Sequence, residues 1–260
     1  MTLDAKAWLV RLPGPDEPIR NGPAVRLFGF PNVGAGPTAF AGLARRLPAR
    51  VEMWGVALPG REARFTEPPR TELAPLVAEL AAALLPHTDH PYALFGYCSG
   101  ALLAYLVARR LADLGAPDPV RLVVADYPPP HLRNRTPDAL LPLESGAFWD
   151  RLIENGGIPE QIVQLKDLRE VFEPAFRADY RLLAQYEHRP GPPVRSPITS
   201  LTGGRDPRAG HDAAGWGRHS DGGVDQERIG HHKWILTESV DELADRLGWI
   251  LGRSTPMEGR

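Results

Sequence analysis

The stretch YALFGYCSGALLAYLVARRL, residues 92–111, decides the fold. Residues 92–95 form a short apolar run typical of a buried strand, and an apolar helical pattern extends from Ser99 to about residue 114. Between them stands the pentapeptide Gly96-Tyr97-Cys98-Ser99-Gly100. A chain that turns from strand to helix this sharply leaves no room for side chains beside the turn, which favours glycine there. The stretch therefore predicts a tight strand–turn–helix elbow with Cys98 at its tip.

A cysteine at this tip is placed for nucleophilic chemistry. The amino terminus of a helix favours the thiolate form, and the backbone N–H of Ser99 can help to bind an oxyanion. Cys98 is the only cysteine of the sequence, so it has no partner for an internal disulfide. The alternatives are that Cys98 is a small buried hydrophobic residue, or that Ser99 is the nucleophile. The strand–turn–helix context favours Cys98 over both.

Strand and helix patterns alternate outward from this elbow, which predicts an α/β protein. We expect a single α/β-hydrolase domain over residues 1–260, with a mostly parallel central sheet flanked by helices. A long helical block without obvious strands, residues 131–187, is interpreted as a helical lid inserted in that domain. The remaining expectations are strands at residues 25–30, 51–56, 92–95, 122–125, 198–201 and 225–229, and helices at residues 38–47, 72–85, 99–114, 212–219 and 238–251.

A nucleophile of this kind needs a histidine as base and an acid to orient it, in the chain order nucleophile, acid, histidine. Asp206 follows a predicted strand and a Gly-Gly turn, and His231 follows the last predicted strand. The sequence therefore predicts a triad of Cys98, Asp206 and His231. His232 is a competing base because it is adjacent, and Asp126, at the end of the fourth predicted strand, is the alternative acid.

The loop after the first predicted strand is expected to complete the oxyanion hole. This loop reads Phe30-Pro31-Asn32-Val33-Gly34. A backbone N–H of Asn32 or Val33 would join that of Ser99 as a hydrogen-bond donor. The alternative is an ordinary glycine turn.

Composition excludes several classes of partner. With 30 basic and 32 acidic residues the formal net charge is −2, so nucleic acid is not an expected partner. No run of 18 apolar residues predicts a membrane-spanning helix, and residues 1–20 lack the pattern of a secretory signal. We expect a cytoplasmic protein that binds neither a metal nor a cofactor of its own.

With these residues in place, the sequence resembles the external (type II) thioesterases of polyketide and nonribosomal peptide assembly lines. The resemblance implies Cys98 as nucleophile, Asp206 as acid, His231 as base and an oxyanion loop at Asn32 and Val33. It also implies that the substrate is an acyl group on the phosphopantetheine arm of an acyl or peptidyl carrier protein, held in a chamber gated by the lid. Members of this family usually act as monomers, so the resemblance also implies a monomer. The stretches that carry it are RLFGFPNVGAG (26–36), LPGREARFTEPP (58–69), GYCSGALLAYLVARRL (96–111), FRADYRLLAQYEHRPGPP (176–193), SPITSLTGGRDP (196–207) and GHH (230–232).

The sequence departs from that family's usual pattern at three places. Cysteine stands where the nucleophile is usually serine, Gly34-Ala35 where a Gly-Gly pair is usual, and His232-Lys233-Trp234 where aromatic residues commonly follow the histidine. A cysteine converts one thioester into another, so the acyl group keeps its transfer potential. Cys98 therefore favours transfer of an acyl or aminoacyl group to an acceptor, with hydrolysis as the alternative. A serine replaced by cysteine to trap an acyl-enzyme would give the same sequence.

Two alternative functions, from other classes of protein, remain. A hydrolase of small molecules similar to dienelactone hydrolases would also place cysteine at the elbow, and a carrier-docking protein without activity would need no nucleophile. The long helical block argues against the first, and the intact order of nucleophile, acid and histidine argues against the second. Arg61, Arg64 and Arg70 are candidate contacts for an acidic carrier or a phosphate, or they belong to a solvated loop.

Overall fold

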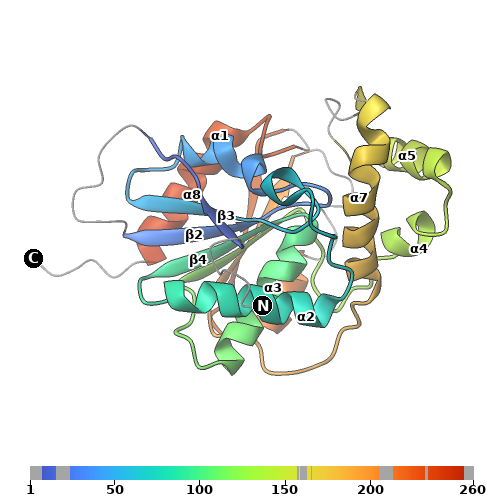
Figure 1. Cartoon of the computed structure of the whole chain (residues 1–260). Helices are drawn as coiled ribbons and strands as arrows, with labels where there is room; N and C mark the ends of the chain where they lie inside the picture. The colour runs from blue at the N-terminus through green and yellow to red at the C-terminus, as the bar shows by residue number, and fades with distance from the viewer. Residues whose placement is uncertain are drawn as a thin grey trace, which may run out of the picture.

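The computed structural model describes residues 8–15, 24–156, 158, 163–164, 166–204, 213–231 and 234–254. Over these residues, seven strands form one sheet in the order β1-β3-β2-β4-β5-β6-β7 (Figure 1). β1 pairs antiparallel with β3, and the other neighbouring pairs are parallel. The sheet is therefore mostly parallel, as the sequence predicted. The strands are β1 (Leu9–Arg11), β2 (Val25–Phe30), β3 (Val51–Val56), β4 (Tyr92–Tyr97), β5 (Arg121–Ala125), β6 (Ile198–Gly203) and β7 (Val224–Ile229).

The order of the strands creates a switch point next to β2. From β2 the chain moves to β3 on one side of it, and it then returns to β4 on the other side. The loops that leave β2 and β4 therefore diverge at the carboxyl edge of the sheet, which is where open α/β sheets bind their ligands. Cys98 follows β4, and Asn32 and Val33 follow β2, so these predicted site residues lie at the switch point.

Helices cover both faces of the sheet (Figure 1). α1 (Ala41–Ala44) and α8 (Val240–Ser254) pack on one face, and α2 (Leu73–Leu84) and α3 (Ser99–Asp113) on the other. Adjacent strand residues point to opposite faces: Leu27 joins the apolar cluster under α1 and α8, and Phe28 joins the cluster under α2 and α3. Both side chains are fully buried, which stabilises the fold by about 2 kcal/mol for each.

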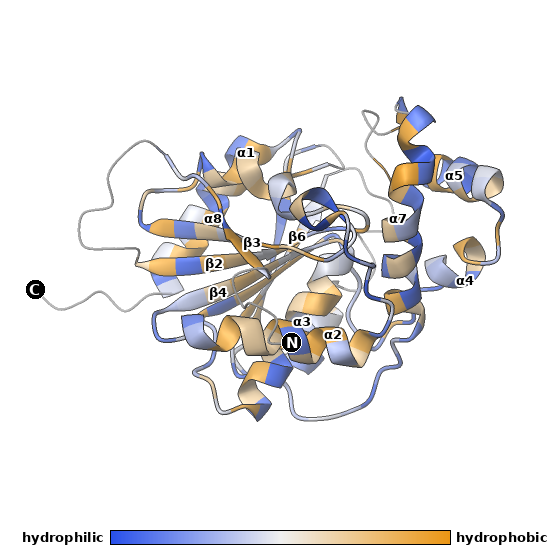
Figure 2. Cartoon of the chain, in the orientation of Figure 1, coloured by the Kyte–Doolittle hydropathy of each residue, from blue (hydrophilic) through white to orange (hydrophobic). Residues whose placement is uncertain are grey.

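A group of helices connects β5 to β6 and forms the helical insertion, residues 136–184. It contains α4 (Thr136–Leu140), α5 (Ser145–Glu154), the short 3-10 helix η5 (Lys166–Leu168) and α7 (Arg169–Ala184). The insertion lies beyond one end of the sheet, and apolar residues alternate with charged ones along its helices (Figure 2). Its apolar side chains form a third cluster that includes Val33 from the loop after β2 and Leu102 from α3. The insertion is therefore packed against the switch point.

Most element boundaries fall within a few residues of those predicted. β2 and β3 have the predicted bounds, while the helix expected at residues 38–47 consists of the 3-10 helix η2 (Pro37–Phe40) followed by α1. The helix expected near 212–219 is also a 3-10 helix, η6 (Ala213–His219). β1 was not predicted, because only one of its three residues is buried and no periodicity marks it. Within the described ranges, no helix has the length and apolar character needed to cross a bilayer.

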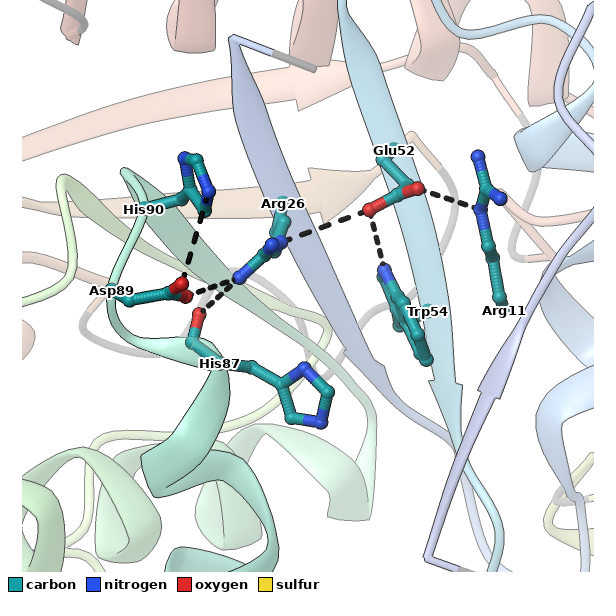
Figure 3. A network of polar contacts seen from close by, with 7 residues as sticks. All are labelled: Arg11, Arg26, Glu52, Trp54, His87, Asp89 and His90. Carbon is teal, nitrogen blue, oxygen red and sulfur yellow. Dashed lines mark hydrogen bonds and ion pairs between the residues drawn. The ribbon is translucent and has the colours of Figure 1, made fainter. Parts of the chain in front are cut away.

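A polar network lies at the opposite, amino-terminal ends of the strands (Figure 3). Glu52 of β3 forms an ion pair with Arg11 of β1 at 2.6 Å and a longer one with Arg26 of β2 at 3.8 Å. Arg26 also pairs with Asp89 at 2.6 Å and donates to the His87 carbonyl at 3.1 Å. The network thus joins β1, β2 and β3 to the segment before β4. It stabilises the edge of the sheet that lies away from Cys98.

Candidate active site

Cys98 occupies a strained turn between β4 and α3. Its backbone has φ 51° and ψ −126°, a conformation that costs a non-glycine residue about 1–3 kcal/mol. The Cys98 N–H donates to the Ala125 carbonyl at 2.8 Å, and the Cys98 carbonyl accepts from the Ala101 N–H at 2.9 Å. A Cβ on Gly96 would lie 2.6 Å from the Ala101 nitrogen, so only glycine fits there. The structure therefore has the strand–turn–helix elbow that the sequence predicted, with a half-buried Cys98 at its tip.

The first turn of α3 is in tight contact with the loop after β2. A Cβ on Gly100 would overlap the Phe30 carbonyl oxygen and would lie 2.6 Å from the Pro31 carbonyl oxygen. This close approach brings the proposed oxyanion loop against the amino terminus of α3. Ser99 begins α3 and is buried, which suits a backbone role for this residue better than a role as nucleophile.

The loop after β2 contains a tight turn over residues 32–35. The Ala35 N–H donates to the Asn32 carbonyl at 3.0 Å, and Gly34 at the third position has φ +75°. A positive φ at this position is typical of a type II turn and favours glycine. Gly34 also faces the insertion, since a Cβ on it would overlap the ring of Phe176 in α7. Asn32 and Val33 therefore occupy a turn that is fixed from both sides.

Gly204, the last described residue before the loop expected to carry the acid, lies against the start of the histidine loop. A Cβ on Gly204, just after β6, would lie 2.6 Å from the Cα of His231. His231 follows β7 and its side chain is exposed. Asp206 and His232 lie outside the described residues, so their roles stay predictions. The Cys98 loop is joined to this region because Cys98 hydrogen-bonds the end of β5 and β5 pairs with β6.

Asp126, the alternative acid, lies directly after β5 at the same edge. It has φ 52°, and its Oδ1 accepts a hydrogen bond from the Gly203 N–H at 2.8 Å. An aspartate in this conformation is uncommon and is held by its surroundings. The carboxylate links the ends of β5 and β6, so Asp126 has a structural role whether or not it also acts on the histidine.

Tyr127, two residues after β5, has a shifted pKa that the sequence did not indicate. Burial raises the pKa of its phenol, and the hydrogen bond from Asn134 and the nearby Cys98 have smaller effects. Its hydroxyl accepts a 3.4 Å hydrogen bond from the Asn134 amide. Tyr127 therefore stays protonated near Cys98. Sequence alone gives no sign of this, because Tyr127 lies within a turn-like Tyr-Pro-Pro-Pro run.

Two of the three arginines considered as carrier contacts are buried and bind groups within the protein. Arg61 is buried and forms an ion pair with Asp179 of α7. Arg64 is also buried and binds Glu67 and the Ala57 carbonyl. These two arginines therefore serve the internal structure. Arg70 is more exposed and pairs with Glu79 at 3.1 Å.

A group of histidines lies where the insertion joins the core. Nδ1 of His131, before α4, lies 2.9 Å from Nε2 of His219 in η6, and the His188 ring, after α7, lies 5.3 Å from the His219 ring. The pKa of His219 is lowered to about 4, mainly by burial and in smaller amounts by the charges of His131, His188 and nearby arginines. In the ranges that the structure describes, no group of three such side chains could hold a metal ion. We interpret this histidine group as a contact that holds both ends of the insertion to the core.

Comparison with known proteins identifies the family of this chain. A sequence model of the thioesterase domain matches residues 25–250, which is most of the chain. The chain belongs to the thioesterase domain family. Solved structures of two relatives are similar. RedJ, a thioesterase from the prodiginine biosynthetic pathway in Streptomyces coelicolor, is 32% identical, with a TM-score of 0.81 over 90% of this chain and 95% of RedJ. The type II thioesterase BorB from the borrelidin biosynthetic cluster is 28% identical, with a TM-score of 0.76 over 98% of both chains.

A curated relative is much longer than this thioesterase-family chain. The AMB antimetabolite synthetase AmbE of Pseudomonas aeruginosa is 33% identical over 227 residues, which make up 85% of this chain and 10% of AmbE. The chain therefore spans a tenth of that relative. The resemblance to type II thioesterases of polyketide and nonribosomal peptide pathways is confirmed, and so is the α/β-hydrolase fold. None of these comparisons identifies the nucleophile of this chain.

Proposed function

We propose that this thioesterase processes acyl thioesters of a polyketide or nonribosomal peptide assembly line through an acyl-enzyme on Cys98. The observation that carries the proposal is the position of Cys98, at the tip of a strained elbow and at the amino terminus of a fifteen-residue helix. That position places the half-buried Cys98 at the carboxyl edge of the sheet, beside the first backbone N–H groups of α3. No other cysteine exists in the sequence to take this role.

In the first half of the reaction, the Cys98 thiol gives its proton to His231, and the resulting thiolate attacks the carbonyl carbon of the acyl thioester. The negative charge moves to the carbonyl oxygen, where the N–H groups of Ser99 and of Asn32 or Val33 would stabilise it. The intermediate then breaks its bond to the phosphopantetheine sulfur, which leaves as a thiol with a proton from His231. The acyl group remains on Cys98 as a new thioester.

In the second half, an acceptor attacks the Cys98 thioester. His231 takes the proton from the acceptor, the bond between the acceptor and the acyl carbon forms, and the bond to Cys98 breaks. Asp206 is proposed to orient His231 and to stabilise its charged form. The contact between the loops after β6 and β7, at Gly204 and His231, supports this pairing. His232 and Asp126 are the alternatives for base and acid.

The nature of the acceptor decides between transfer and hydrolysis. Passing the acyl group from one thiol to another is nearly isoenergetic, so a cysteine enzyme can deliver it to a second thiol, an amine or a hydroxyl. Water as acceptor would instead release a free acid. We favour transfer because of the cysteine, and the thioesterase names of RedJ and BorB support hydrolysis as the second candidate.

The proposed partner is an acyl or peptidyl carrier protein that presents the acyl group on phosphopantetheine. RedJ and BorB come from the prodiginine pathway and the borrelidin biosynthetic cluster, which supports this class of partner. The apolar cluster between the helical insertion and Val33 suits a lid over an acyl chain, and it is not a feature that a hydrolase of small anions needs. A cytoplasmic monomer remains our expectation.

Intact-protein mass spectrometry tests the proposal directly. The enzyme is mixed with an acyl-loaded carrier protein and an excess of a second, unloaded carrier. We expect an acyl adduct on the enzyme and the acyl mass on the second carrier, and Cys98→Ala should abolish both. Free acid with an empty second carrier would instead establish hydrolysis. Turnover by Cys98→Ala would contradict the acyl-enzyme altogether.

A further inference from the structure

A buried ion pair joins the helical insertion to the core next to the oxyanion loop. Asp179 lies in the middle of α7, and Arg61 lies in the loop after β3, 118 residues earlier. Arg61 Nη1 donates to Asp179 Oδ2 at 2.6 Å, and Arg61 Nη2 donates to Asp179 Oδ1 at 2.7 Å. This two-bond geometry fixes the direction as well as the distance of the pair. Both side chains are buried, with 6% and 8% of their surface exposed.

The same two side chains hold the backbone of the oxyanion loop. The Gly34 N–H donates to Asp179 Oδ2 at 2.8 Å, and Arg61 Nη1 donates to the Ala35 carbonyl at 3.2 Å. One carboxylate oxygen is thus shared between the loop and the guanidinium group. Because the Gly34 N–H is bound to Asp179, the oxyanion role falls to the amides earlier in the loop, at Asn32 or Val33.

A second contact between the insertion and the turn runs through Phe176, one helical turn before Asp179. Its ring is packed so closely on Gly34 that a Cβ there would overlap it. The 32–35 turn therefore has α7 on one side and, through the carbonyl groups of Phe30 and Pro31, the first turn of α3 on the other. Movement of α7 away from the core would remove both Asp179 and Phe176 from the turn, and it would leave Arg61 as a buried charge without its carboxylate.

We propose that Asp179 and Arg61 are positioning residues that fix the oxyanion loop and so make the oxyanion hole depend on the seated position of α7. The inference rests on the proposed function, because it assumes that the carbonyl oxygen of the substrate binds at this loop. Catalysis would then require the insertion to be closed over the acyl group. An acyl-enzyme whose insertion is displaced would lack the loop geometry needed for attack by an acceptor or by water.

The competing explanation is that the pair only fastens the helix. A matched control lies on the same helix: Glu173 pairs with Arg177 at 2.7 Å, and Arg177 donates to the carbonyls of Leu141 and Leu143. These contacts stay within the insertion. Glu173→Gln therefore removes a comparable charge from α7 without touching the turn, whereas Asp179→Asn changes the group that binds it. A double variant, Arg61→Met with Asp179→Leu, replaces the buried pair by apolar side chains of similar size and protects the fold.

Two reactions of Cys98 separate the explanations. Acylation by an acyl thioester of N-acetylcysteamine develops an oxyanion, whereas alkylation by iodoacetamide occurs at a saturated carbon and does not. We expect Asp179→Asn and the double variant to lower kcat and the acylation rate by about 10- to 100-fold. Their alkylation rate, their KM and the elution volume of the folded protein should be unchanged. Glu173→Gln should leave both reactions at the wild-type rate.

Three results would overturn the inference. Wild-type acylation by both Asp179 variants would show that the loop does not need the pair. An equal loss of acylation and alkylation would show a general structural effect, and an equal loss in Glu173→Gln would assign the effect to helix stability. Failure of the proposed function has a different signature, since wild-type enzyme would then form no adduct on Cys98, or Cys98→Ala would still cleave the thioester. That result would remove the basis of the inference as well.

Discussion

The Asp126 carboxylate accepts a 2.8 Å hydrogen bond from the Gly203 N–H, so the end of β5 holds the start of the loop that leads to Asp206. Two aspartates therefore compete for the role of triad acid, one inside the described residues and one outside. The hydrogen bond gives Asp126 a structural role that an asparagine can also fill, because an amide oxygen accepts the same bond. The Asp126→Asn variant therefore tests whether the carboxylate is needed for catalysis while the structural hydrogen bond is kept.

We predict that Asp126→Asn keeps activity within a few-fold of wild type, whereas Asp206→Asn lowers kcat by at least about 100-fold, since the histidine loses its orienting charge. Steady-state cleavage of an acyl thioester measures both. The opposite ranking, with the larger loss in Asp126→Asn and unchanged unfolding temperatures, would make Asp126 the acid.

The adjacent histidines can be separated by the same assay. We predict that His231→Gln lowers the rate of thioester cleavage by about 1000-fold, because both proton transfers lose their carrier, and that His232→Gln has a much smaller effect. If His232→Gln shows the large loss instead, the base is reassigned to His232.

Cys98→Ser changes the fate of the acyl group rather than simply abolishing turnover. The acyl-enzyme becomes an oxyester, from which return to a thiol is uphill while hydrolysis remains downhill. We predict that the ratio of free acid to acyl-loaded acceptor carrier rises by about 10-fold or more, in keeping with a loss of transfer potential of a few kcal/mol. Quantitative mass spectrometry of both products measures this ratio. An unchanged ratio would show that the nucleophile does not control the outcome.

Gly100 is predicted to be intolerant of any side chain. A methyl group there would overlap the Phe30 carbonyl and force the oxyanion loop away from α3, so Gly100→Ala should destabilise the fold by about 2–3 kcal/mol and abolish acylation. Gly146 of α5 is the matched control, since a Cβ on it meets nothing within 4 Å. Gly146→Ala should stabilise the protein slightly. Equal urea midpoints for the two variants would contradict this explanation.

The histidine group at the base of the insertion predicts a pH-dependent stability. His219 has a pKa of about 4 in the folded protein, mainly because it is buried, against about 6.5 when unfolded. The unfolded chain therefore binds more protons between these values, and stability falls as the pH falls through this window. We predict that wild type loses about 2 kcal/mol more than His219→Gln between pH 7 and pH 5.

Urea unfolding at both pH values measures this difference. The exposed His90, replaced by Gln, serves as the control and should behave like wild type. If wild type and His219→Gln lost the same amount of stability between pH 7 and pH 5, other groups would be the cause of the acid sensitivity.

Local patterns explain how much of this molecule could be predicted from its sequence. β2, β3 and the elbow at Cys98 were predicted because apolar runs and glycines that signal them lie within a few residues of one another. The Arg61–Asp179 pair was missed because its partners are 118 residues apart, and no local pattern indicates that a charged loop residue will be buried by a later helix. Tyr127 was missed for a similar reason, since its environment is formed by the insertion.

The positions of His131 and His188 have a consequence for how such a chain can be remodelled. One residue precedes α4 and the other follows α7, yet their rings lie 6.2 Å apart, each beside His219. The two ends of the insertion therefore join the core at neighbouring points. A foreign helical block grafted in place of residues 136–184 would have to fit that gap and also keep the contacts of Asp179 and Phe176 with the turn over residues 32–35. With those contacts kept, we expect an exchanged insertion to alter acyl-chain preference while the sheet and the elbow at Cys98 stay unchanged.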